Sequence, residues 1–212
     1  MKGLIYKDLL YLKSSYKQLL ITFIIVIFLC FYKNYLDIVL IGLPCLFSMI
    51  IIGSMQIEQE NLMHIYISIS SLKLEKVVLS KYISYFILTL IGIMISVLLC
   101  LLVNVIGNNQ SNSFTDMMGI SIGSGFSFIF GSTIIPIYYM FKDKKIDTLL
   151  SYSMIAIAVF IVIVLSLLKN LNGSMFMNNL DFVSYVFSFI SVLIYVCSFC
   201  ITLIIIRYEG LV

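Results

Sequence analysis

Long runs of apolar residues alternate with short polar connections along the whole chain. A helix rises about 1.5 Å per residue, so about 20 mostly apolar residues cross a hydrocarbon core of roughly 30 Å. Six stretches reach or approach that length. We therefore predict an all-α polytopic integral membrane protein with six transmembrane helices, at residues 19–35, 36–55, 83–106, 117–141, 148–168 and 182–206.

The composition agrees with this pattern. Hydrophobic residues make up 62% of the 212 residues and charged residues 11%. Soluble domains contain about 45–50% apolar and about 25% charged residues. No internal repeat and no linker interrupts the pattern, so we expect one transmembrane domain over residues 1–212.

The distribution of Lys and Arg indicates the orientation of the spans. Cationic residues in short loops collect on the cytoplasmic side of a membrane protein. All but two of the 13 Lys and Arg residues fall on the side of the amino terminus, the exceptions being Lys33 and Lys169. Both termini are therefore expected in the cytoplasm. The residues on that side are Lys2, Lys7, Lys13, Lys17, Lys73, Lys76, Lys81, Lys142, Lys144, Lys145 and Arg207.

The amino-terminal residues 2–17 have the spacing of an amphipathic helix that lies in the membrane interface. Apolar residues recur every three or four positions and form one stripe, while Lys7 lies on the opposite side. The stripe consists of Ile5, Leu9, Leu12 and Tyr16. A basic tail that only sets the topology is the alternative. No signal-peptide cleavage site follows, so we expect this segment to be retained.

The chain lacks the residues that most membrane enzymes require. The predicted span cores contain no Asp, Glu, Lys, Arg or His, and the sequence has neither an HExxH pattern nor a GxxxxGK[ST] phosphate-binding loop. The cysteines lie inside apolar spans, where the thiols are expected to stay neutral. We predict no catalytic residue, no metal site and no cofactor on this chain. The cysteines are Cys30, Cys45, Cys100, Cys197 and Cys200.

One cytoplasmic connection, residues 56–82, is longer than the others. An acidic half with Glu58 and Glu60 precedes a basic half with Lys73 and Lys76, and a moderately apolar stretch around His64 lies between them. Such a stretch forms either a short helix that docks on a partner or a solvated linker. Composition alone favours the linker.

Three segments resemble one protein family. Residues 1–10, which read MKGLIYKDLL, resemble the opening of small bacterial permeases of the type-2 ATP-binding-cassette (ABC) transporters. Residues 71–82 resemble the family's segment before its third span, and residues 136–139 with the Lys-bearing turn that follows resemble the end of its fourth span. Length and six-span topology extend the resemblance over nearly the whole chain.

The resemblance implies a permease subunit in the bacterial plasma membrane. Such a subunit pairs with a second permease, identical or homologous, and rests on two separate ATPase subunits, which bind ATP and Mg. By analogy, residues 56–82 would be the coupling loop, with Glu58 and Glu60 facing basic residues of the ATPase. The predicted contact residues are Gln56, Glu58, Glu60, Asn61, His64, Lys73 and Lys76.

Small residues and two prolines mark the second and fourth spans. Gly119 and Gly123 form a GxxxG pattern, which permits close approach of helices and more often serves packing within one chain than dimerisation. Pro44 and Pro136 each remove a backbone hydrogen bond and are expected to kink their helices.

A path lined by apolar and hydroxyl side chains without buried charge suits an amphipathic or lipid-like cargo. Permeases similar to this chain export antimicrobial or cytolytic peptides. We therefore expect an exporter of an antimicrobial, toxin or phenol-soluble-modulin-like peptide. The alternative is a membrane-embedded binding or immunity protein that sequesters a toxic peptide without ATP-driven turnover.

Overall fold

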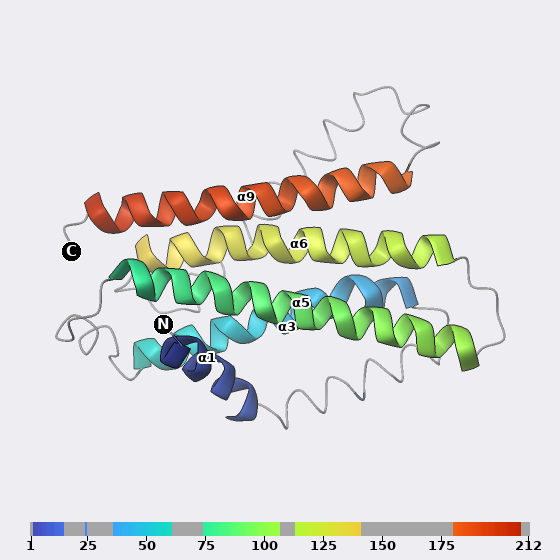
Figure 1. Cartoon of the computed structure of the whole chain (residues 1–212), viewed down its shortest axis with the longest axis horizontal. Helices are drawn as coiled ribbons and strands as arrows, with labels where there is room; N and C mark the ends of the chain where they lie inside the picture. The colour runs from blue at the N-terminus through green and yellow to red at the C-terminus, as the bar shows by residue number, and fades with distance from the viewer. Residues whose placement is uncertain are drawn as a thin grey trace.

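The computed structural model describes residues 2–14, 24, 36–60, 74–106, 113–140 and 180–208, and these residues are helical. Four long helices form a bundle, and a shorter amino-terminal helix lies against one end of it (Figure 1). The helices are α1 (Lys2–Ser14), α3 (Leu36–Glu60), α5 (Leu74–Ile106), α6 (Ser113–Met140) and α9 (Leu180–Tyr208).

Within the described residues, three helices are long and apolar enough to cross a membrane. The corresponding stretches are Leu74–Leu102 of α5, Met117–Met140 of α6 and Val183–Tyr208 of α9. The apolar part of α3, Leu40–Met55, is shorter. The predicted helices at these four places are therefore present. The predicted spans at 19–35 and 148–168 lie outside the described residues, apart from Ile24.

The helices extend further into the predicted connection 56–82 than the sequence indicates. Helix α3 continues through Glu60, and α5 begins at Leu74 rather than near Ile83. The early part of α5 is helical because it packs against the bundle, with Val77 and Val78 both buried. Only residues 61–73 of the predicted connection lie outside the described part of the chain.

Neighbouring helices run in defined directions. Helices α3 and α5 are antiparallel, since Lys81 near the start of α5 meets Ser54 late in α3, while Gly92 meets Pro44 further back. Helices α5 and α6 are also antiparallel, because Tyr85 reaches Ser127. In each pair, the first helix ends at the end of the bundle where the second helix begins (Figure 1).

Helices α6 and α9 lie side by side and run in the same direction (Figure 1). Hydroxyl groups join them at three levels, and the partners are 63, 64 and 66 positions apart in the sequence. Hydroxyl hydrogen bonds satisfy polar groups inside apolar surroundings and favour one alignment of two membrane helices. The pairs are Ser121 Oγ to the Ser184 carbonyl at 3.0 Å, Ser124 Oγ with Ser188 Oγ at 3.1 Å, and Ser198 Oγ to the Ser132 carbonyl at 2.7 Å.

Glycines permit two close helix crossings. A Cβ atom on Gly123 of α6 would lie 2.7 Å from the backbone of Ile41 in α3. A Cβ atom on Gly92 of α5 would lie 2.9 Å from the Cα of Pro44, also in α3. Helix α3 is therefore held between α5 and α6 by backbone contacts that a larger residue would prevent.

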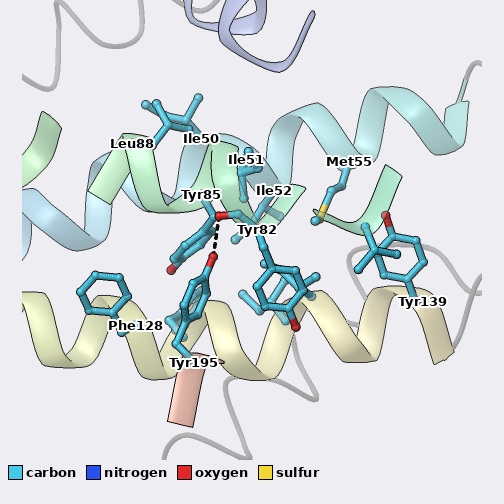
Figure 2. Close-up of a cluster of buried hydrophobic side chains, with 14 of the residues drawn as sticks. Ile50, Ile51, Ile52, Met55, Tyr82, Tyr85, Leu88, Phe128, Tyr139 and Tyr195 are labelled. Atoms are coloured by element: carbon cyan, nitrogen blue, oxygen red, sulfur yellow. Dashed lines mark hydrogen bonds between the residues drawn. The ribbon is translucent and has the colours of Figure 1, made fainter. Parts of the chain in front are cut away.

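Aromatic rings fill the core between α5, α6 and α9 (Figure 2). The rings of Tyr82 and Tyr85 each lie within 5.6 Å of the Tyr195 ring, measured between centroids. The Tyr195 hydroxyl donates to the Tyr82 carbonyl at 2.7 Å, and the Tyr85 hydroxyl donates to the Ser127 carbonyl at 2.6 Å. These tyrosines add apolar area to the core, and their hydroxyl groups still have hydrogen-bond partners.

The crossing of α3 and α6 supplies a stability test. We expect Gly123→Ala to lower the free energy of unfolding by about 1–3 kcal/mol, because the new methyl group overlaps the backbone of Ile41. Thermal unfolding of the detergent-solubilised protein measures the effect. Gly42→Ala is the matched control, since a Cβ atom there meets no heavy atom within 4 Å. Equal melting temperatures for the two variants would contradict the close crossing.

Candidate functional site

Four charged side chains from three helices meet at the end of the bundle where α3 ends and α5 begins. They are Lys7 and Asp8 of α1, Glu58 of α3 and Lys81 of α5, and we call them the charge network. Lys81 Nζ lies 2.7 Å from Asp8 Oδ1 and 2.8 Å from Glu58 Oε1. Lys7 forms an ion pair with the same Glu58 carboxylate. Two cations thus balance two anions.

The charge network is largely shielded from solvent. The side chain of Lys81 is 2% exposed and that of Asp8 1%, whereas that of Lys7 is 33% exposed. Removing one partner of a buried pair leaves an uncompensated charge, so such pairs hold their groups in position. Lys81 is therefore the centre of the network, and Lys7 lies at its edge.

Two serines complete the hydrogen bonding of the charged groups. Lys81 Nζ donates to Ser54 Oγ at 3.3 Å, and Ser84 Oγ donates to Asp8 Oδ2 at 3.2 Å. An ammonium group has three N–H donors, and Lys81 directs them to Asp8, Glu58 and Ser54. No buried side-chain nitrogen or oxygen in the described residues lacks a hydrogen-bond partner.

Burial dominates the titration of Asp8. Loss of water raises the pKa of its carboxyl above the ordinary value of 3.8, and the attraction of Lys81 opposes this without cancelling it. The native state therefore takes up a proton at a pH where the unfolded chain remains ionised.

Helix α1 turns charged residues toward the protein and large apolar residues outward. Asp8 is buried, whereas Tyr6 is 65% and Leu10 is 44% exposed. The predicted stripe began at Ile5 and placed Lys7 on the opposite, outer side. In the structure Ile5 is half-buried, and Lys7 is directed at Glu58 because this carboxylate lies beneath α1.

The predicted coupling residues have different positions. Glu58 is 7% exposed and binds Lys7 and Lys81 within this chain, and its contact with the ATPase stays a prediction. Gln56 and Glu60 belong to the last turns of α3. Lys76 is exposed on the first turns of α5. The residues outside the described part of the chain are Asn61, His64 and Lys73.

The predicted packing residues lie inside the bundle. Gly119 is buried on α6, and Gly123 meets α3 of the same chain. Pro44 and Pro136 lie within α3 and α6, and both helices continue past them. Pro44 lies at the crossing with α5 next to Gly92.

A second ion pair joins the carboxyl end of α9 to the start of α5. Arg207 Nη2 lies 2.7 Å from Glu75 Oε1, and both side chains are substantially exposed, at 67% and 45%. A cation at a helix carboxyl end and an anion at an amino end each interact favourably with the helix dipole. The carboxyl end of α9 thus lies near the first turns of α5 (Figure 1).

Asp8 and Lys81 were not predicted as site residues. Lys81 was counted among the cations that set the topology, and Asp8 lies in the segment predicted as an amphipathic helix. The sequence does contain a signal, because acids and a lysine of opposite charge lie near the ends of three helices. The pairing itself depends on the fold, since Asp8 and Lys81 are 73 positions apart.

The described residues at this end of the bundle form no cluster of metal ligands. Among the residues that the structure describes, no group of three or more His, Cys, Asp or Glu side chains is arranged to hold a metal ion. Both acids of the charge network are paired with lysines. The arrangement can hold helices together and can respond to a change of charge.

Neutralising the centre of the network tests its contribution to stability. We expect Lys81→Met to lower the free energy of unfolding by about 3–5 kcal/mol, because two buried carboxylates would share Lys7 alone. Arg207→Gln, which removes the exposed pair, should cost less than about 1 kcal/mol. Thermal unfolding in detergent compares the two variants. A larger effect of Arg207→Gln would refute the assignment.

The raised pKa of Asp8 predicts the sign of a pH effect. Lowering the pH through the range between the native pKa and 3.8 protonates the native carboxyl first, which favours the folded state. The melting temperature of the wild type, relative to that of Asp8→Asn, should therefore rise as the pH falls through this range. A falling difference would mean that attraction by Lys81 outweighs burial.

Comparison with known proteins gives the family. The chain matches the family model described as ABC-2 family transporter protein over residues 3–207. Searches of curated proteins and of solved structures found no match. The match covers the amino-terminal helix, all four long helices and the connections between them. The chain therefore belongs to the ABC-2 transporter family and is a membrane protein of the permease type.

Proposed function

We propose that this chain is the membrane-spanning subunit of an ATP-driven exporter of amphipathic peptides in the bacterial plasma membrane. Its ABC-2 family membership supports a permease role and implies ABC ATPase subunits as partners. The observation that carries the proposal is this match over residues 3–207. In the proposed complex, two permease subunits, identical or homologous, rest on two ATPase subunits, which bind ATP and Mg.

The interior of the described bundle supports an amphipathic cargo. Its buried ionisable acids and bases are Asp8, Glu58 and Lys81, and all three belong to the charge network at one end. Elsewhere the buried polar groups are mainly Ser, Thr and Tyr hydroxyls among apolar side chains. Such surroundings suit a peptide with apolar and polar faces better than a small ion, which needs fixed charged or carbonyl ligands.

The directions of the helices support six crossings. Helix α6 ends at the charge-network end of the bundle, and the parallel α9 begins at the opposite end (Figure 1). A span at the predicted residues 148–168 would connect these two ends. Likewise α1 lies at the charge-network end and α3 begins at the other, which fits a span at 19–35.

The distribution of charge supports cytoplasmic termini. Lys7, Lys76 and Arg207 all lie at the charge-network end, as do the start of α1 and the end of α9. Lys and Arg concentrate on the cytoplasmic side of membrane proteins. The ATPase would therefore bind at this end, next to the connection between α3 and α5.

Coupling contacts are proposed on both sides of that connection. Because Glu58 is occupied inside the protein, the candidates are Gln56, Glu60 and Lys76 on the helices, together with Asn61, His64 and Lys73. Reversing the charge of Glu60 tests a contact with the ATPase without disturbing the ion pairs of the charge network.

Reconstitution tests the proposed function. The complex of permease and ATPase would be placed in liposomes with the ATPase outside, and uptake of a fluorescently labelled amphipathic helical peptide would be followed. We expect uptake that requires ATP and that stops when the catalytic glutamate of the ATPase is replaced by Gln. Glu60→Lys should reduce the amount of ATPase that co-purifies, whereas Arg207→Gln should leave it unchanged.

The same experiment separates the alternative function. A protein that sequesters a toxic peptide would protect cells, and would bind the labelled peptide, equally well with an inactive ATPase. Protection that is independent of ATP hydrolysis would therefore refute the exporter. Failure of any ATPase to co-purify would refute the assembly itself.

A further inference from the structure

The described side chains of α1 meet the bundle through charged groups. The large apolar residues Tyr6 and Leu10 point away from the protein, while Asp8 is buried and Lys7 contacts Glu58. Leu4 and Ile5 are only partly buried. Among these described side chains, the charge network therefore provides the specific connection of α1 to the bundle.

Lys81 makes this connection with three groups on two other helices. Its ammonium group reaches Asp8 Oδ1 at 2.7 Å on α1, and Glu58 Oε1 at 2.8 Å and Ser54 Oγ at 3.3 Å on α3. With a side chain only 2% exposed, the ammonium group meets little competing water. Moving α1 away would leave a carboxylate and an ammonium group poorly compensated, which is costly in a buried position.

The position of the network relates it to energy coupling. Glu58 lies in the last turns of α3, and Lys81 lies in the early turns of α5. These are the two helix ends next to the proposed ATPase contact. Lys81 therefore connects α1 to the end of α3 and to the start of α5.

We propose that Lys81 is a positioning residue for transport, because its ammonium group holds α1 and the end of α3 to α5 so that the three move together during the ATPase cycle. The inference rests on the proposed function. It assigns to Lys81 a role in the coupling of ATP hydrolysis to transport, separate from binding of the ATPase or the cargo.

A charge-balanced variant separates this role from stability. Lys81→Met combined with Asp8→Asn removes one cation and one anion and leaves the neutral pair of Lys7 and Glu58. We expect the complex to assemble and hydrolyse ATP, while the peptide transported per ATP falls by about tenfold, within the range typical of coupling between sites. The conservative variant Lys81→Arg keeps a cation with N–H donors for Asp8, Glu58 and Ser54, and it should retain most of the transport per ATP.

The matched control removes the exposed pair at the same end of the bundle. The double variant Glu75→Gln and Arg207→Gln is also charge-balanced. The ion pair that it removes joins α9, not α1, to α5. It should transport at the wild-type ratio. Wild-type transport by the Lys81→Met and Asp8→Asn variant would overturn the proposal, as would loss of ATPase binding in that variant, which would show a purely structural role.

A distance measurement tests the attachment independently of cargo. Spin labels would be placed on Tyr6→Cys in α1 and Leu90→Cys in α5, both exposed positions outside the proposed ATPase contact, in a chain whose five native cysteines are replaced by Ala. The label-to-label distance should keep one narrow distribution with and without trapped ATP, and it should broaden when Lys81→Met and Asp8→Asn are added. An unchanged distribution would overturn the inference. Absence of ATP-dependent uptake by the wild type would instead refute the proposed function.

Discussion

The binding of Lys81 to Asp8 and Glu58 is the interaction on which the arrangement of this end of the bundle depends. A lysine side chain that is 2% exposed is stable in ionised form only if acids and hydroxyls surround it. Those groups come from α1 and α3, so the three helices must assemble together. Lys81 lies in the early turns of α5, and the packing of Val77 and Val78 in the same turns fixes its position relative to these partners.

The rest of the bundle is held by different forces. Glycines bring the backbone of α3 against α5 and α6, and serine hydroxyls align α6 with α9. Tyrosines between α5, α6 and α9 combine apolar area with hydrogen bonds to backbone carbonyls. In lipid, where apolar surface alone drives little association of helices, close contact and hydroxyl bonding are the expected means of packing. Among the described residues, the charged ones thus lie toward the two ends of the bundle, with Asp37, Asp116 and Asp181 at the end opposite the charge network, and the middle of the bundle carries none.

Sequence periodicity and charge predicted much of this, and the misses have a physical cause. The helices at 36–55, 83–106, 117–141 and 182–206 followed from runs of apolar residues, because crossing a bilayer requires them. The end of α3 and the start of α5 could not be predicted in this way, because Glu58 and Lys81 look like residues of a solvated loop. Their charges are compensated by each other and by two residues of α1, Lys7 and Asp8, that are distant in the sequence. Periodicity describes one helix at a time and contains no information on such partners.

The separation of Asp8 from Lys81 also has a consequence for biosynthesis. The two residues are 73 positions apart, so at about 5–20 residues per second the ribosome adds Lys81 roughly 4–15 s after Asp8. During that interval α1 exists without the cation that it needs for burial. The amino-terminal helix must therefore wait in a polar environment and dock only after α5 has entered the membrane. Although it is synthesised first, it reaches its final position only after Lys81 of α5 has been made.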